Sequence, residues 1–190
     1  MTSELISQYK GIGKVIVAFN LLDTQLNSFI GWLISNDIGT GQIVTSQINS
    51  VANRLRLFFI LYKYKASRLE WFKPPILKEH FAMRNDLVRK ANLLMKEAEK
   101  INEIRNKIIH STWFQQQRHL DQYGKKAQLT GLRIKPEGSP TIKSGKVGLN
   151  YQVVSFTKKE LDIYVRRIER FGVELIKLRK ETEDLANKKT

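Results

Sequence analysis

Apolar residues recur at steps of three and four over the first part of the chain. Between residues 4 and 35 they include Leu5, Ile12, Phe19, Leu26 and Leu33. Side chains three or four positions apart share one face of a helix, so this spacing predicts one long helix. The sequence Gly39-Thr40-Gly41 is expected to break the pattern, and a second helix is predicted over residues 43–65.

The pattern changes character in the second half of the chain. After Pro74 and Pro75, residues 76–111 favour a third helix, which bends near residues 93–98 or runs straight. Residues 113–157 hold many turn-forming residues and short alternating runs, which favour a small antiparallel β insert with a loop at 136–146. Thr157 and Glu160 have the spacing of a capping box, which predicts a final helix to about residue 185. The expected fold is therefore mainly α: a four-helix bundle with a β insert before its last helix.

Composition adds a strong charge to this picture. The chain has 190 residues, 33 Lys and Arg against 18 Asp and Glu, and a formal net charge of +15. The length suits a single domain over residues 1–190. A charge of this size indicates an anionic partner, either nucleic acid or a membrane surface. Residues 41–100 carry +7 and residues 101–157 carry +6, so the middle of the chain is expected to meet that partner.

Several classes of function are disfavoured by what the chain lacks. It has no Cys, which excludes disulfides, thiolate metal sites and thiol catalysis. Its three His residues are not at ligand spacing, so we expect neither a metal nor a cofactor. The start of the chain has no signal-peptide pattern, and the most apolar window, residues 15–34, contains Asp23 and several amides. We therefore expect a soluble cytoplasmic protein that does not enter the membrane. The chain also has no amphipathic tail and no polybasic end, which favours RNA over a membrane surface as the anionic partner.

One short motif has chemical meaning. Arg105-Asn106 is followed by His110 at the end of the third predicted helix. On an ideal helix Asn106 and His110 lie about 40° apart, opposite Ile101, Ile104 and Ile108, while Arg105 lies about 140° from His110. Arg105 and His110 therefore meet at one ligand only if the helix distorts or a second subunit completes the site. His transfers protons near neutral pH and Arg matches phosphate, which suits metal-independent RNA cleavage. On spacing alone, a surface His with no function is the alternative.

The segment Arg105-Asn106-Lys107-Ile108-Ile109-His110 resembles the signature of HEPN domains, at the end of the third helix where that family carries it. The resemblance implies a helical bundle that forms a homodimer with a composite cleft, often a metal-independent endoribonuclease acting as a toxin or in anti-phage defence. It implies that Arg105 holds the scissile phosphate, His110 acts in proton transfer or phosphate positioning, and Asn106 supports both. A tyrosine that some toxins of the family carry two residues after the His is replaced here by Thr112.

Two further expectations concern partners. Lys107 and the cations of the insert are candidates for RNA contact, although a solvated hairpin explains the insert equally well. The insert cations are Arg118, Lys125, Lys126 and Arg133. The alternative to an enzyme is a HEPN RNA-binding or scaffold protein without catalysis. A toxin neutralised by an acidic antitoxin or regulatory protein is a further hypothesis.

Overall fold

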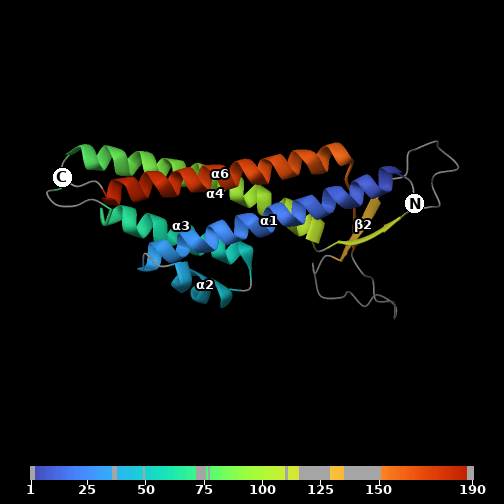
Figure 1. Cartoon of the computed structure of the whole chain (residues 1–190), viewed down its shortest axis with the longest axis horizontal. Helices are drawn as coiled ribbons and strands as arrows, with labels where there is room; N and C mark the ends of the chain where they lie inside the picture. The colour runs from blue at the N-terminus through green and yellow to red at the C-terminus, as the bar shows by residue number, and fades with distance from the viewer. Residues whose placement is uncertain are drawn as a thin grey trace, which may run out of the picture. The chain divides into compact units, whose positions relative to one another are not determined.

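The protein is mainly helical, as the sequence predicts (Figure 1). The structure, a computed structural model, describes residues 3–35, 38–48, 50–71, 76, 78–109, 111–115, 129–134 and 151–187. The helices are α1 (Ser3–Ser35), α2 (Ile38–Ser46), α3 (Val51–Ser67), α4 (Lys78–Ile109) and α6 (Lys158–Asn187). The strands are β1 (Thr112–Gln115), β2 (Leu129–Ile134) and β3 (Tyr151–Ser155).

The predicted break at Gly39 and Gly41 is wrong, because both residues lie inside α2. Each glycine costs a helix only about 1 kcal/mol, which packing compensates readily. Thr45, near the end of α2, is almost fully buried. The next helix therefore starts later than predicted, at Val51, where Ser50 caps it by accepting a hydrogen bond from the backbone N–H of Asn53 (3.4 Å).

The remaining helices follow the sequence pattern closely. α1 spans the predicted range, and α4 runs without interruption through residues 93–98, where the pattern had also allowed a bend. The capping box of α6 is confirmed: the Thr157 backbone N–H donates to Glu160 Oε2 (2.7 Å), and the Glu160 N–H donates to Thr157 Oγ1 (3.2 Å).

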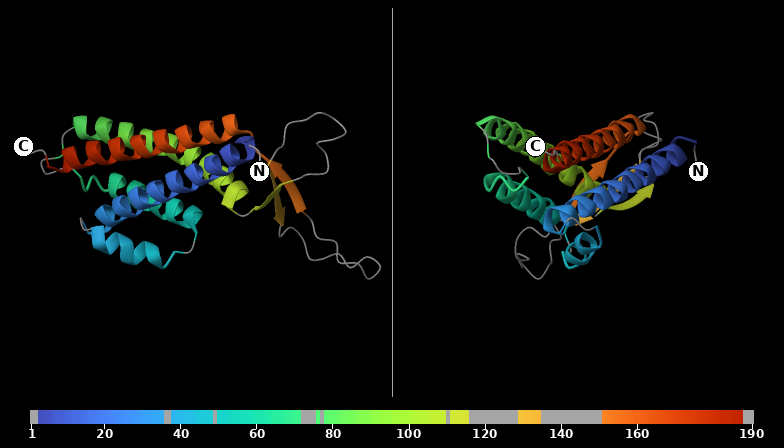
Figure 2. Two further views of the ribbon diagram at one scale, coloured as in Figure 1. Left: turned by 45° about the vertical axis from the view of Figure 1, so that its right-hand side comes forward. Right: turned by 60° about the vertical axis from the view of Figure 1, so that its left-hand side comes forward.

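The three strands form one antiparallel sheet in the order β1-β2-β3, drawn as arrows in Figure 2. Trp113 pairs with Gly131, and Gly131 pairs in turn with Val154. β1 begins only three residues after the end of α4, so the sheet directly follows the helix that carries the Arg-His motif. The predicted loop at residues 136–146 lies outside the described residues.

Contacts between Cα atoms divide the chain into two compact units. Unit 1 comprises residues Met1–Val17 and Glu103–Arg166, and unit 2 comprises residues Ala18–Asn102 and Arg167–Thr190. The single domain remains a prediction. Unit 1 buries apolar side chains from α1, the end of α4, the segment before α6 and the start of α6: Ile12, Val15, Ile104, Ile108, Phe156 and Leu161. A Cβ atom on Gly11 would lie 2.8 Å from Leu161 Cδ1, so glycine permits the close approach of α1 and α6 there.

Unit 2 is built around a cluster of aromatic rings. The ring of Phe58 in α3 lies 4.9 Å from that of Phe29 in α1, and the rings of Tyr62 and Trp71 are 4.7 Å apart. Phe29, Phe58, Tyr62 and Trp71 are all buried. Tilted and edge-on ring pairs at these separations add to the apolar burial that holds α1 and α3 together.

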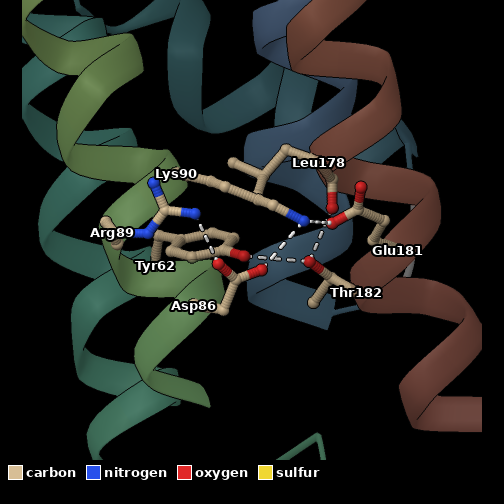
Figure 3. A network of polar contacts seen from close by, with 7 residues as sticks. All are labelled: Tyr62, Asp86, Arg89, Lys90, Leu178, Glu181 and Thr182. Atoms are coloured by element: carbon tan, nitrogen blue, oxygen red, sulfur yellow. Dashed lines mark hydrogen bonds and ion pairs between the residues drawn. The ribbon is translucent and has the colours of Figure 1, made fainter. Parts of the chain in front are cut away.

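A polar network joins three helices of unit 2 (Figure 3). The Thr182 hydroxyl donates to the Leu178 carbonyl (2.7 Å), so the Tyr62 hydroxyl, 3.0 Å away, is the donor to Thr182 Oγ1. Burial raises the pKa of Tyr62 well above its usual value, which keeps this donor protonated. Beside it, Lys90 Nζ lies 2.7 Å from Glu181 Oε2 and 2.9 Å from Asp86 Oδ2.

Candidate active site

The end of α4 has the rotation that the sequence predicts. Ile101, Ile104 and Ile108 are 2%, 8% and 1% exposed, so this stripe faces the protein core. Burial of three isoleucines on one face fixes which way the neighbouring polar side chains point. The positions of Arg105, Asn106 and Lys107 on α4 are therefore set by apolar packing rather than by polar contacts.

Arg105 and Asn106 lie one after the other in the last turns of α4, and both side chains are half-buried. Neither side chain has a hydrogen bond or ion pair with another residue in the described part of the chain. Lys107 is exposed, and its carbonyl accepts a hydrogen bond from the Ser111 hydroxyl (2.5 Å) just beyond the helix. A guanidinium that is positioned by its helix but not neutralised by a carboxylate is available to an anion.

The structure brings together only part of the predicted site. Arg105, Asn106 and Lys107 are placed on α4, whereas His110 lies outside the described residues. The separation of Arg105 from His110 therefore remains a prediction. Of the insert cations, Arg118, Lys125 and Lys126 also lie outside the described residues, and Arg133 belongs to β2, where only the backbone is described.

Other parts of the described chain offer less for catalysis. No group of three or more His, Asp or Glu side chains in the described ranges is arranged to hold a metal ion. Unit 2 contains an open groove of about 290 Å³ between α4 and α6. Its Lys90 and Lys177 are paired with Glu181 (2.7 Å) and Glu174 (2.8 Å), and none of the motif residues lines it. None of the helices in the described ranges combines the length and the apolar composition that a membrane span requires.

One set of cations was missed by the sequence analysis. Arg56, Lys63 and Arg68 lie on or just after α3 with exposed side chains. The signal was present in the sequence, because residues 38–69 contain five Lys or Arg and no Asp or Glu. The net charge of residues 41–100, taken as a whole, hides this stretch, because residues 70–100 contain acidic as well as basic residues.

Comparison with known proteins does not place the chain in a family. No family model, no curated protein and no solved structure matches the chain.

Proposed function

We propose that this protein is a metal-independent endoribonuclease of the HEPN type, with its composite site at a homodimer interface. The proposal extends to a role as a toxin or anti-phage effector. It rests on Arg105, Asn106 and His110 as the catalytic residues, with RNA as the substrate. The half-buried Arg105 of α4, which has no carboxylate partner in the described part of the chain, is the observation that supports it most.

Each residue has a role in the proposed reaction. The 2′-oxygen of the substrate attacks the adjacent phosphorus, and the bond from phosphorus to the 5′-oxygen breaks. A base takes the proton from the 2′-hydroxyl and an acid returns one to the 5′-oxygen; His110 performs one of these transfers. Arg105 offsets the negative charge that grows on the phosphate oxygens, and Asn106 orients His110 or the substrate. The products are a cyclic 2′,3′-phosphate and a free 5′-hydroxyl.

The test is cleavage of single-stranded RNA by the full-length protein in EDTA. General acid–base catalysis contributes roughly 10²–10⁴-fold, so His110→Ala is expected to reduce the rate by about that factor. Arg105→Ala is expected to reduce it by about 10²–10³-fold, as for loss of a charge-stabilising donor. Arg84→Ala is the matched control: it removes an Arg that also precedes an Asn on α4, outside the motif.

The variants distinguish cleavage by this protein from cleavage by a contaminating ribonuclease, and from loss of activity through misfolding. Cleavage that survives both motif substitutions contradicts the proposal, as does a wild-type protein that cuts no RNA. Equal loss in Arg84→Ala means that the motif is not special. Circular dichroism of all three variants checks that the helical content is unchanged.

A second candidate function is a HEPN RNA-binding or scaffold protein without catalysis. The exposed cations of α3 favour it, because they provide positive charge far along the chain from the motif. This candidate is supported if the protein binds RNA with steep salt dependence but never cuts it, and if His110→Ala leaves the RNA affinity unchanged.

The toxin role has its own test. Expression of the protein should arrest growth, and His110→Ala or a co-expressed acidic antitoxin should relieve the arrest.

A further inference from the structure

The charges of α3 differ in kind from those elsewhere in unit 2. From Val51 to its C-cap residue Arg68, this segment carries five cations and no acidic residue. Two of the cations are neutralised within unit 2. Arg54 pairs with Asp23 of α1 (3.2 Å), and Lys65 pairs with Glu70 (3.2 Å).

The other three cations point away from the core. Phe58, Phe59, Tyr62 and Ala66 form the buried side of α3. On an ideal helix Arg56 and Lys63 fall about 20° apart and about 95° round from the centre of this buried side, and Arg68 falls about 135° from that centre. Arg56, Lys63 and Arg68 are exposed, and none of them has an ion pair with a residue in the ranges that the structure describes.

An aromatic ring lies among these cations. Tyr64 is 51% exposed, and the Arg68 guanidinium carbon lies 4.9 Å from its ring centroid. Stacking of a guanidinium on the ring holds both flat groups in place. Ile60, 59% exposed, lies on the same side. We call the set Arg56, Ile60, Lys63, Tyr64 and Arg68 the α3 basic face.

We propose that the α3 basic face binds single-stranded RNA, with Arg56, Lys63 and Arg68 on phosphates and Tyr64 stacked on a base. This inference rests on the proposed function for its choice of RNA and names a surface for the substrate outside the motif. Unpaired cations interleaved with an exposed aromatic ring are the usual means of holding a single strand without reading its sequence. Arg56 and Arg68 lie about 18 Å apart along α3, so the face is long enough to contact several phosphates of one strand.

The alternative polyanion, an acidic membrane surface, fits this face less well. A helix that lies on a membrane inserts a broad apolar side beneath its cations. The broad apolar side of α3 is already occupied, because Phe58, Phe59 and Tyr62 are buried in unit 2. The large aliphatic side chain that remains exposed on α3 is Ile60, and its neighbours on that side are polar, aromatic or charged.

The experiment measures binding of a labelled 20-nucleotide 2′-O-methyl RNA to the full-length protein by fluorescence anisotropy from 50 to 300 mM KCl. This probe lacks the 2′-hydroxyl nucleophile, so it is not cut even if the proposed nuclease is active. Each phosphate contact on a single strand contributes about 0.7 to the slope of log K against log salt. The triple variant Arg56→Gln, Lys63→Gln, Arg68→Gln should flatten the slope by about 2 and weaken binding roughly 100-fold at 0.1 M salt.

A charge-matched control isolates position from net charge. The triple variant Arg89→Gln, Lys177→Gln, Lys180→Gln removes the same charge from exposed sites on α4 and α6. It should retain the wild-type slope within about 0.5 and lose affinity less than about fivefold. Equal losses in the two triple variants would overturn the proposal, since they would show that only net charge matters.

Tyr64 separates stacking from electrostatics. Tyr64→Ala should weaken binding by at least fivefold with no change in the salt slope, because the ring carries no charge. Tyr64→Phe should bind as the wild type does. Equal affinity of Tyr64→Ala and wild type would contradict the stacking role.

Two further comparisons complete the test. Sedimentation with vesicles of phosphatidylserine and phosphatidylcholine should show no binding that depends on the α3 basic face. Vesicle binding lost in the first triple variant, with RNA binding intact, would assign the face to membranes and overturn the proposal. The result is also distinct from that of the nuclease assay. RNA that binds through α3 but is never cut refutes only the proposed catalysis. Cleavage together with unchanged RNA affinity in the first triple variant refutes only the binding surface.

Discussion

Helices α3 and α6 both carry many cations but use them in different ways. α6 contains eight Lys or Arg and seven Asp or Glu. Two guanidinium nitrogens of Arg167, Nε and Nη2, donate to the two carboxylate oxygens of Glu97. Arg179 donates to Glu183 (2.6 Å) and to Ser28 (2.6 Å).

α6 also has exposed cations outside the described ion pairs, such as Arg170 and Lys180, but they lie among its seven acidic residues. The three exposed cations of α3 have no ion pair in the described residues, and their helix carries no acidic residue at all. Charges that are paired serve the fold, whereas charges left unpaired are available to a ligand.

The largest expected change in stability comes from the buried side of α3. Phe58 is fully buried between Phe29 and Phe59, so Phe58→Ala should lower the free energy of unfolding by about 3–5 kcal/mol. Urea denaturation followed by circular dichroism measures the change. Ile60→Ala, two residues along on the exposed side, should change stability by less than about 0.5 kcal/mol. Similar costs for the two would mean that α3 does not present distinct structural and exposed sides.

A smaller effect is expected from the paired cations of α6. Arg167→Ala removes a two-pronged contact to Glu97 whose side chains are 35% and 34% exposed. Solvent screening limits the loss to about 1–2 kcal/mol in the urea experiment. The adjacent exposed Arg166 is the control, and Arg166→Ala should be nearly neutral. If a double-mutant cycle of Arg167→Ala with Glu97→Ala gave no coupling, the paired cations of α6 would not be stabilising after all.

A still smaller change in stability is expected from the hydrogen bond between Tyr62 of α3 and Thr182 of α6. Tyr62→Phe keeps the buried ring but removes the hydrogen bond donated to Thr182, while Thr182 still donates to Leu178. The expected cost is about 1 kcal/mol, the net value of one buried hydrogen bond. Thermal unfolding in parallel with Tyr64→Phe, at an exposed position of the same helix, measures it. A larger loss in Tyr64→Phe would show that the exposed hydroxyl, and not the buried one bonded to Thr182, contributes to stability.

These comparisons also show what the sequence reveals. The extents of α1 and α6 could be predicted because they depend on local information: apolar spacing, and a capping box between Thr157 and Glu160. α2 was missed because Gly39 and Gly41 look like helix breakers until the burial of Thr45 is known. The rotation of α4 followed from Ile101, Ile104 and Ile108, which placed Arg105 and Asn106.

The charges are harder to predict because pairing is a tertiary property. Nothing local in the sequence joins Arg54 to Asp23, or Arg167 to Glu97, 70 residues away. Without those pairs, all cations of the chain look equivalent. The usable signal was the absence of acidic residues from residues 38–69. It appears only when charge is counted over windows about as long as one helix. The Arg105–His110 relation depends on backbone geometry at a helix end, which periodicity does not determine.

Acid titration tests the ion pairs that α4 makes with α6 and within itself, which the exposed cations of α3 lack. The bonds from Arg167 hold the pKa of Glu97 below its usual value, and those from Arg89 and Lys90 do the same for Asp86. A lowered folded-state pKa means that the stabilisation is present above the unfolded value of about 4 and is lost as the pH falls through the folded value. The urea midpoint of the wild type should therefore fall between about pH 5 and 3. The double variant Glu97→Gln, Asp86→Asn should start lower and fall less, and an identical fall in both would contradict the assignment.

The smallest expected effect on stability comes from the α3 basic face itself. Arg56→Gln, Lys63→Gln, Arg68→Gln removes three exposed cations that have no ion pairs in the described residues. Relief of repulsion in a chain of net charge +15 offsets the loss of the Arg68 contact with Tyr64, so the free energy of unfolding should stay within about 0.5 kcal/mol of wild type. A urea titration at 50 and 300 mM KCl measures this, and the higher salt should narrow any difference. A loss above about 1.5 kcal/mol would place these cations with those of α6, as parts of the fold. A neutral result beside a roughly 100-fold loss of RNA affinity would identify α3 as a helix whose buried side holds the structure and whose charged side is free for binding.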